Sequence, residues 1–403
     1  MQIMIKSVIA ILFFIFTPLA CAASTDSAPW FSKAGNNQIK LRVDLFMAST
    51  CPHCQQADAF FRDLQAKRPW LDVHRYEINQ DKQALEYFRQ QLNLLKTDDY
   101  SVPAVLFCNS RWVGFDKPET TGQVLAKSLD FCYQQITKTG ELKSNTVKIL
   151  TQWANASFLA GSLTPTSKAI VVIPLIASMD SLNSCSIFCL LALFSFLWLY
   201  KDKSIMLGLG ILFIVVVAVV HHFQQNHAIF FYQVLHNLRI LAALIGLGLI
   251  AYVFVLYSKG ANVQPGIVIP ILVGLTALVI ESYQQVCLPN FALIFTQWLD
   301  AQKPSSFAKG IYAIFYSLVY VIPLILFMVL LIYCRVKKKI EKCKAVLVCM
   351  AWCLLLIIGI ILVIYPRGLS NYLCSVLALL LSFVAAWLTV RRARRLKNKQ
   401  GAQ

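Results

Sequence analysis

The sequence predicts a two-part protein, in which an α/β domain is followed by an all-α polytopic membrane domain. Three observations lead to this expectation. Of the 403 residues, 58% are hydrophobic, which is too apolar for a soluble chain of this length. The acidic residues are concentrated early, since 14 of the 19 lie between residues 24 and 150. After residue 168, apolar stretches long enough to cross a bilayer recur to the C-terminal tail.

Residues 1–22 have the pattern of an export signal. Lys6 precedes an apolar core, and Ala20-Cys21-Ala22 forms a small-x-small cleavage site. Two alternatives remain open: an uncleaved first membrane anchor, or lipidation at Cys21, although Pro18 fits that pattern poorly. In each case the following domain is exported to a compartment that permits disulfides.

Residues 24–135 are expected to fold as one α/β domain, because alternating apolar runs give way to helical periodicity and back again. The expected elements are, in order, a strand at 39–47, a helix at 54–66, a strand at 72–79, a helix at 81–93, strands near 103–108 and 111–115, and a helix at 120–135. Residues 136–167 contain interspersed Thr, Ser, Asn and Gly and are predicted to form a flexible linker.

Two cysteines directly after the first predicted strand indicate a redox site. In Cys51-Pro52-His53-Cys54, a helix that begins at Pro52 would place Cys51 at its N-terminus, where free N–H groups and the helix dipole favour a thiolate. We therefore expect Cys51 to be the nucleophile and Cys54 to resolve the mixed disulfide. His53 adds a donor that would make the pair more oxidising. A zinc half-site and an inert structural disulfide are the alternatives.

This motif, with Val102-Pro103 at the start of a later strand, resembles the thioredoxin superfamily. The resemblance implies that Pro103, usually cis in that fold, faces the active cysteines and holds a substrate strand. Cys-Pro-His-Cys is typical of DsbA-like periplasmic oxidants, although the chain lacks the large helical insertion of DsbA. Cys108 and Cys132 are expected either to form a second disulfide or to be buried single thiols.

The membrane domain, residues 168–390, is expected to have seven spans, near 169–199, 204–221, 238–257, 266–295, 310–334, 345–365 and 371–390. With the first domain outside, the inner loops and the basic tail at 391–403 carry 15 Lys or Arg, against 4 in the outer loops. The positive-inside rule therefore predicts an external redox domain and a cytoplasmic C-terminus. Together with the resemblance to DsbA-like periplasmic oxidants, this implies a bacterial inner membrane protein with a periplasmic redox domain.

The net charge of +18 is thus explained by topology, and no nucleic-acid partner is expected, since residues 24–150 contain 16 basic against 14 acidic residues.

Two predicted spans are interrupted by polar residues. Asp180 precedes Cys185 in one, and Glu281 precedes Cys287 in the other; these two acids are the only ones inside the apolar stretches. Ionisable groups at this depth indicate function, so both are candidates for proton handling, with capping of broken helix ends as the alternative. Interruptions at matching places predict a 3+3 inverted repeat plus one extra helix.

This half resembles the CcdA and DsbD transmembrane family, whose two membrane cysteines carry electrons across the bilayer. Asp180-x-x-Asn183-x-Cys185 and Cys287-Leu-Pro289 occupy the places of those cysteines. The family usually has proline beside both, whereas Ser184 and Ser186 flank the first here. Six other cysteines in this half are expected to be packing residues: Cys189, Cys334, Cys343, Cys349, Cys353 and Cys374.

Together, these features predict a thiol:disulfide interchange protein. Reducing equivalents would pass from cytoplasmic thioredoxin through Cys185 and Cys287 to Cys51 and Cys54, and then to exported thiol or disulfide proteins. No quinone, haem or flavin motif is found, and no cofactor is expected. No metal site is expected either, because the histidines near the second span, His221, His222, His227 and His236, fit a solvated loop.

Two rival functions remain open. The first is a membrane-anchored DsbA-like oxidase that runs in the opposite direction. The second is an ion- or proton-coupled transporter with an exported redox domain, which would tolerate Ser at both membrane cysteines.

Overall fold

The computed structural model describes residues 30–33, 39–162, 168–259, 266–287, 290–336 and 343–400. The predicted signal peptide, with Cys21, lies outside these residues, as do Pro289 and part of the basic tail. The chain divides into two compact units, Met1–Ser162 and Leu163–Gln403.

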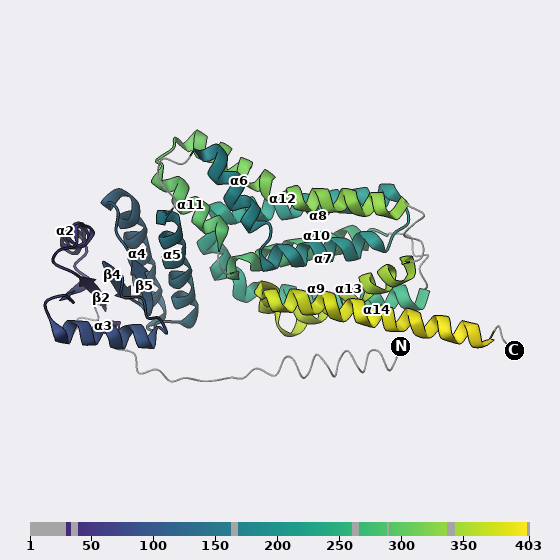
Figure 1. Ribbon diagram of the computed structural model, residues 1–403, viewed down its shortest axis with the longest axis horizontal. Coiled ribbons are helices and arrows are strands. Elements are labelled where there is room, and N and C mark those ends of the chain that lie inside the picture. Colours follow the sequence, from purple (N-terminus) through teal and green to yellow (C-terminus); the bar gives the residue numbers. More distant parts are fainter. Residues whose placement is uncertain are drawn as a thin grey trace. The chain divides into compact units, whose positions relative to one another are not determined.

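The first unit is a five-stranded sheet covered by helices (Figure 1). The strands are β1 (Phe31–Lys33), β2 (Ile39–Met47), β3 (Leu71–Glu77), β4 (Ala104–Phe107) and β5 (Ser110–Val113). The helices are α2 (Pro52–Lys67), α3 (Lys82–Leu94), α4 (Gln123–Thr139) and α5 (Ser144–Ser162), with a π-type turn at Pro118–Gly122 before α4. This order confirms each strand and helix predicted between residues 39 and 135 to within a few residues.

Strand β2 is the centre of the sheet. Its residues from Leu41 to Met47 pair in parallel with β3, and residues 44–46 pair antiparallel with β4. The short β1, which was not predicted, pairs antiparallel with the first residues of β2, and β5 pairs with the outer side of β4. All side chains of β2 except two near its start are buried or nearly so, as expected of a strand covered on both faces.

The core on one face of this sheet is aromatic. Phe46 of β2 stacks on Phe88 of α3 with ring centroids 4.3 Å apart, and Leu92 of the same helix joins this cluster. Because side chains alternate along a strand, Val43 and Leu45 point to the opposite face. Figure 1 shows α2 and α3 on opposite sides of the strands, so the sheet is covered from both directions.

The predicted linker at 136–167 is wrong over most of its length, because α4 continues to Thr139 and α5 occupies Ser144–Ser162. Helix α5 packs against β5 and α4. Its buried side chains follow helical spacing at Thr146, Ile149, Leu150 and Trp153, and the Trp153 ring contacts Phe131 of α4 with centroids 5.5 Å apart. Apart from the buried Thr146, most of the polar residues that indicated a linker are exposed on this helix.

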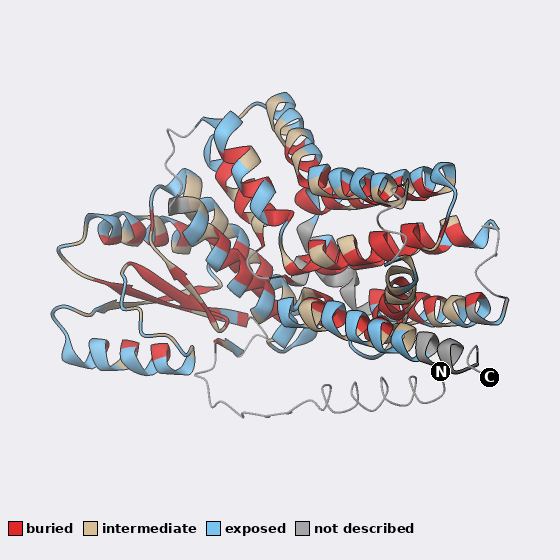
Figure 2. Ribbon diagram, turned by 45° about the vertical axis from the view of Figure 1, so that its right-hand side comes forward, coloured by how far each residue is buried: buried red, intermediate tan, exposed pale blue. Residues whose placement is uncertain are grey.

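In the second unit, every regular element within the described ranges is a helix. The α-helices are α6 (Ala169–Asp180), α7 (Ser184–Trp198), α8 (Lys203–Asn226), α9 (Ala228–Lys259), α10 (Val268–Ser282), α11 (Phe291–Ala301), α12 (Ser306–Val336), α13 (Lys344–Ile364) and α14 (Tyr372–Gln400). Two short 3₁₀ turns, η2 (Tyr283–Val286) and η4 (Pro366–Ser370), lie after α10 and α13. Many of these helices have a buried side and an exposed side (Figure 2). Large apolar residues lie on the exposed sides of several of them.

Among the described residues, five helices are long and apolar enough to cross a membrane: α8, α12, α13 and the apolar parts of α9 and α14. The bent pair α6 and α7, with 65° between its helices, gives a sixth span if it counts as one. Helix α10 is apolar but shorter. The two stretches predicted to be interrupted, 169–199 and 266–295, are the ones that break into separate helices.

Close packing joins α9 to α13. A side chain at Gly246 would meet the backbone oxygen of Gly359 at 2.5 Å, and one at Gly359 would meet that of Gly246 at 2.9 Å. The two helices therefore approach at backbone distance, as small residues allow inside membranes.

Candidate functional site

The first site is at the start of α2. Cys51 is the N-cap residue, Pro52 occupies the first helical turn, and the Sγ of Cys51 accepts a hydrogen bond of 3.2 Å from the N–H of Cys54. The two cysteines are joined as a disulfide, with their Cα atoms 5.2 Å apart. A sulfur at this position receives the free N–H groups and the positive end of the helix dipole, which stabilise a thiolate on reduction.

Exposure separates the two sulfurs in the manner expected of a nucleophile and a resolving thiol. Cys51 is half-buried, whereas Cys54 is only 1% exposed. His53 is exposed and lies between them in the sequence. The accessible sulfur is thus Cys51.

Pro103 lies at the same end of the sheet. Its peptide bond with Val102 is cis. Ala104 pairs with Phe46 in antiparallel register, so Pro103 precedes β4 at the edge where β2 runs toward Cys51. The carbonyl of Pro103 accepts a hydrogen bond from Gly114.

A buried carboxylate in β2 was not singled out from the sequence. Asp44 is fully buried and accepts hydrogen bonds from Arg42 Nε and the Tyr87 hydroxyl, both at 2.8 Å. Burial and the hydrogen bond to Asp44 raise the pKa of Tyr87 above its ordinary range. The group is satisfied internally and supports the face of the sheet that packs on α3.

Cys108 and Cys132 are joined in the same unit, with Cα atoms 6.8 Å apart. Cys108 lies in the turn between β4 and β5, where it has a φ of 49°, and Cys132 is in α4. Both are fully buried, so this disulfide links the sheet to its covering helix and is away from solvent.

The second site is a cysteine pair at two helix breaks of the second unit. Cys185 is the second residue of α7, and Cys287 directly follows η2. They are joined as a disulfide with Cα atoms 7.0 Å apart, although 102 positions separate them in the sequence. Their exposed fractions are 0% and 1%. The structure thus brings together the two cysteines that the interrupted spans singled out.

Asn183 causes the helix break before Cys185. Its side-chain oxygen caps α7 by accepting a 2.8 Å hydrogen bond from the N–H of Ser186, and its amide donates to Asp180 Oδ1 at 2.8 Å. This N-cap begins a new helix at Ser184, so the chain can break here without a proline beside Cys185. The absence of proline beside Cys185 therefore does not prevent the interruption.

Ser184 links the cysteine pair to η4. Its hydroxyl lies 2.7 Å from the carbonyl oxygen of Ser370, at the end of η4, and 3.6 Å from the Sγ of Cys287. The turn η4 also packs against η2, which precedes Cys287.

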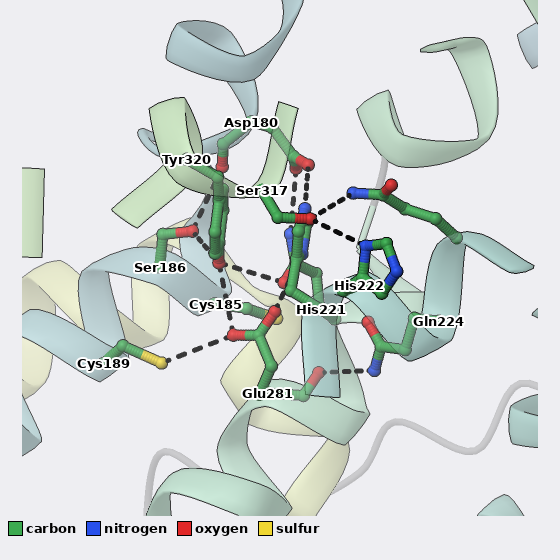
Figure 3. Close-up of polar contacts among 12 residues, drawn as sticks. Asp180, Cys185, Ser186, Cys189, His221, His222, Gln224, Glu281, Ser317 and Tyr320 are labelled. Atoms are coloured by element: carbon green, nitrogen blue, oxygen red, sulfur yellow. Dashed lines mark hydrogen bonds and ion pairs between the residues drawn. The ribbon is translucent and has the colours of Figure 1, made fainter. Parts of the chain in front are cut away.

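Beside this pair lies a buried polar cluster, drawn in Figure 3. Asp180 ends α6 and is 1% exposed. Its Oδ2 accepts a 2.8 Å hydrogen bond from the Tyr316 hydroxyl, and its Oδ1 accepts one of 2.9 Å from Gln284 Nε2. Three different helices therefore meet at this carboxylate.

Glu281, near the end of α10, is fully buried as well. Its Oε1 lies 3.0 Å from His221 Nδ1, and its Oε2 lies 3.2 Å from the Tyr320 hydroxyl. The other ring nitrogen of His221, Nε2, is 3.5 Å from Asp180 Oδ2. One imidazole of α8 thus stands between the two membrane carboxylates (Figure 3).

The expectation that the four histidines form a solvated loop is wrong for His221. This residue has no exposed surface, and its ring stacks on Tyr320 at a centroid distance of 3.8 Å. His222 and His227 are more open, and the side chain of His236 lies outside the described set. Two patterns could have indicated the cluster: the helical continuation of α8 through His221, and the spacing of Tyr316 and Tyr320 on one face of α12.

Cys189 connects the cluster to the cysteine pair. It lies one turn after Cys185 on α7, is fully buried, and its Sγ is 3.7 Å from Glu281 Oε2. Ser186 approaches from the same helix, with its Oγ 2.8 Å from the Tyr320 hydroxyl. Cys189 therefore packs in a polar site and not among apolar side chains alone.

Among the residues that the structure describes, no group of three or more His, Cys, Asp or Glu side chains is arranged to hold a metal ion. The chain matches no protein-family model, no curated protein and no solved structure in the comparisons with known proteins.

Proposed function

We propose that this protein is a membrane thiol:disulfide interchange protein, a protein-disulfide reductase that carries reducing equivalents from cytoplasmic thioredoxin to exported proteins. The observation that supports it most directly is the pairing of Cys185 with Cys287. Two cysteines 102 positions apart, both at helix breaks and both buried, meet at disulfide distance in a unit of apolar helices.

The route consists of two exchange reactions. A cytoplasmic dithiol reduces the Cys185–Cys287 disulfide, and a thiolate of this pair then attacks the Cys51–Cys54 disulfide. The first unit acts as a thioredoxin-like domain: Cys51 caps a helix after a central strand, and Pro103 lies at the same end of the sheet. Its reduced form then reduces extracytoplasmic proteins.

The proposed topology has seven spans, with α6 and α7 as one broken span and α10 and α11 as another. The resemblance to the CcdA and DsbD family, with two membrane cysteines at broken helices, supports this arrangement. The excess of basic residues in the tail supports a topology with the C-terminus in the cytoplasm of a bacterium and the first unit in the periplasm.

Trapping of the thiols in intact cells tests this function. Alkylation after acid quenching measures the fraction of Cys51–Cys54 that is reduced. We expect a mostly reduced pair in wild type, and a mostly oxidised pair in cells without cytosolic thioredoxin and in the Cys185→Ser and Cys287→Ser variants. Cys334→Ser, near the C-terminal end of α12, is the matched control, and in this variant Cys51–Cys54 should stay mostly reduced. A pair that is oxidised in wild type and in all variants contradicts the proposal.

Two other functions have an observation in their favour. His53 is exposed beside Cys51 and favours an oxidant, so a DsbA-like oxidase running in the opposite direction is the first. In that case Cys51–Cys54 is oxidised in wild type and becomes reduced in the membrane cysteine variants. The two buried acids favour an ion- or proton-coupled transporter as the second, and transport would then survive Ser at both Cys185 and Cys287.

A further inference from the structure

The polar cluster beside the membrane cysteines contains too few positive charges for its carboxylates. Asp180 and Glu281 share one imidazole, and no Lys or Arg pairs with either acid among the described residues. Burial of charge in a membrane is costly unless it is neutralised. The state without net charge holds two dissociable protons, one that makes His221 an imidazolium and one on a carboxyl group. The cluster can therefore store protons.

Opening a buried disulfide requires a proton. When a thiolate attacks the Cys185–Cys287 disulfide, the S–S bond breaks, one sulfur enters a mixed disulfide, and the other leaves as a thiolate. This thiolate is formed in a site that is 0 to 1% exposed and that has two carboxylates nearby. It is stable only after protonation, and bulk water is not in contact with it.

We propose that His221, held between Asp180 and Glu281, is the proton store of the membrane cysteine pair. The inference rests on the proposed thiol exchange at Cys185 and Cys287. A proton passes from the cluster to the leaving thiolate, and the cluster recovers a proton that the incoming thiol released when it became the attacking thiolate. The reaction as a whole converts one dithiol and one disulfide into one disulfide and one dithiol, with no net change in protons.

Glu281 and Cys189 provide the path to the sulfurs. Glu281 contacts His221 through one oxygen and the thiol of Cys189 through the other. Cys189 lies on the same face of α7 as Cys185, one turn away, because residues four apart are neighbours on a helix. His221 acts through these groups and does not need to touch the reacting sulfurs.

The titratable groups in contact with His221 come from three other helices: Asp180 of α6, Glu281 of α10, and Tyr316 and Tyr320 of α12. Cys189 of α7 contacts Glu281. His222, the next residue of α8, contacts Ser317 and lies outside the cluster.

The test measures the rate at which dithiothreitol reduces Cys185–Cys287 in the purified full-length protein, between pH 6 and pH 8.5, by alkylation and mass spectrometry. Each variant is compared with wild type at the same pH, so the titration of the reductant cancels. In His221→Gln and Cys189→Ala the proton must come from bulk water. We expect their rates relative to wild type to fall by about tenfold per pH unit above neutrality.

His222→Gln is the matched control, because this histidine follows His221 directly but contacts Ser317 and neither carboxylate. Its relative rate should stay within about twofold of wild type at all pH values. Cys189→Ala removes a small side chain only, so its pH profile remains informative if His221→Gln folds poorly.

A relative rate that does not depend on pH in Cys189→Ala and in a folded His221→Gln overturns the proton store but leaves the thiol relay intact. A pH profile in His222→Gln equal to that of His221→Gln overturns it too. If both membrane cysteines of the wild type still react with the alkylating reagent after the purified protein has been oxidised, the proposed function fails together with this inference.

Discussion

The two cysteine pairs of this chain differ in what surrounds their sulfurs. Cys51 lies half-buried at a helix N-terminus, where backbone N–H groups favour its thiolate. Cys185 and Cys287 have almost no exposed surface and lie near two carboxylates and a histidine. The first pair is arranged to stabilise a sulfur anion and to meet large partners. Cys185 is also in the first turn of a helix, but its burial and the nearby carboxylates disfavour the anion, so the chemistry of this pair depends on where a proton is kept.

The largest expected effect concerns the buried charges of the second unit. Glu281→Ala leaves His221 without its closer carboxylate and should lower the free energy of unfolding by about 3 to 5 kcal/mol. Asp300→Ala, which removes an exposed pair with Lys309, should cost about 1 kcal/mol or less. Denaturant titration of the purified protein measures both. Equal losses would mean that the cluster is not the charged centre described here.

The second prediction concerns where the first unit ends. Trp153 of α5 packs on Phe131 and is 8% exposed, so Trp153→Ala should lower the free energy of unfolding of the first unit by about 3 kcal/mol. Phe158 of the same helix is 56% exposed, and its replacement by Ala should change stability by about 0.5 kcal/mol or less. Thermal unfolding of the fragment 24–162 tests this difference. If Trp153→Ala lowers the free energy of unfolding no more than Phe158→Ala does, α5 is not part of the folded first unit and the prediction of a flexible linker holds.

The third prediction compares the sulfurs directly. After complete reduction, Cys51 should react with iodoacetamide at least about tenfold faster than Cys185 or Cys287, because it is accessible and its thiolate is stabilised. Peptide mass spectrometry at timed intervals measures the three rates in one sample. Equal labelling of Cys185 would mean that the membrane pair is open to solvent.

The smallest effect is a pH dependence of the first unit. Hydrogen bonds from Ser101, together with the Arg111 guanidinium, lower the pKa of Asp99 to about 2. A carboxylate with a lowered pKa stabilises the fold at pH values above the ordinary pKa of aspartate, about 3.9. This contribution is lost as the pH falls toward 2.

Since the side chain of Asp99 is 43% exposed, solvent limits the contribution to about 1 kcal/mol or less. In Asp99→Asn this part of the acid destabilisation between pH 4 and pH 2 should be absent, as measured by urea unfolding of the fragment 24–162. An unchanged acid slope would contradict the assignment.

The sequence allowed good prediction where local patterns decide the structure. Strand β2 begins and ends at the predicted residues because turn and helix residues follow its apolar run, and the helix after Cys51 begins where Pro52 permits it. The membrane cysteines could be paired because each follows an acid at an interruption. In contrast, α5 was missed because polar residues are interspersed along it and even its buried positions include Thr146 and Gln152.

The polar cluster could be predicted only in part. Asp180 and Glu281 are recognisable because acids are rare within apolar stretches. His221 is not, since its sequence neighbours are the histidine and glutamines of an apparent helix end, and only the packing of α8 against α10 and α12 buries it. Contacts between residues 60 positions apart, such as His221 with Glu281, depend on tertiary structure that periodicity does not contain.

The hydroxyl of Ser184 has two acceptors but a single hydrogen. In the disulfide state the carbonyl of Ser370 is close, at 2.7 Å, and the weakly basic sulfur of Cys287 is more distant. Reduction turns that sulfur into a better competitor for the same hydrogen, at the moment when it carries negative charge. The hydrogen bond from Ser184 of α7 to η4 is therefore weakest during the turnover of the buried pair. Ser184 thus couples the redox state of the cysteine pair to the position of η4.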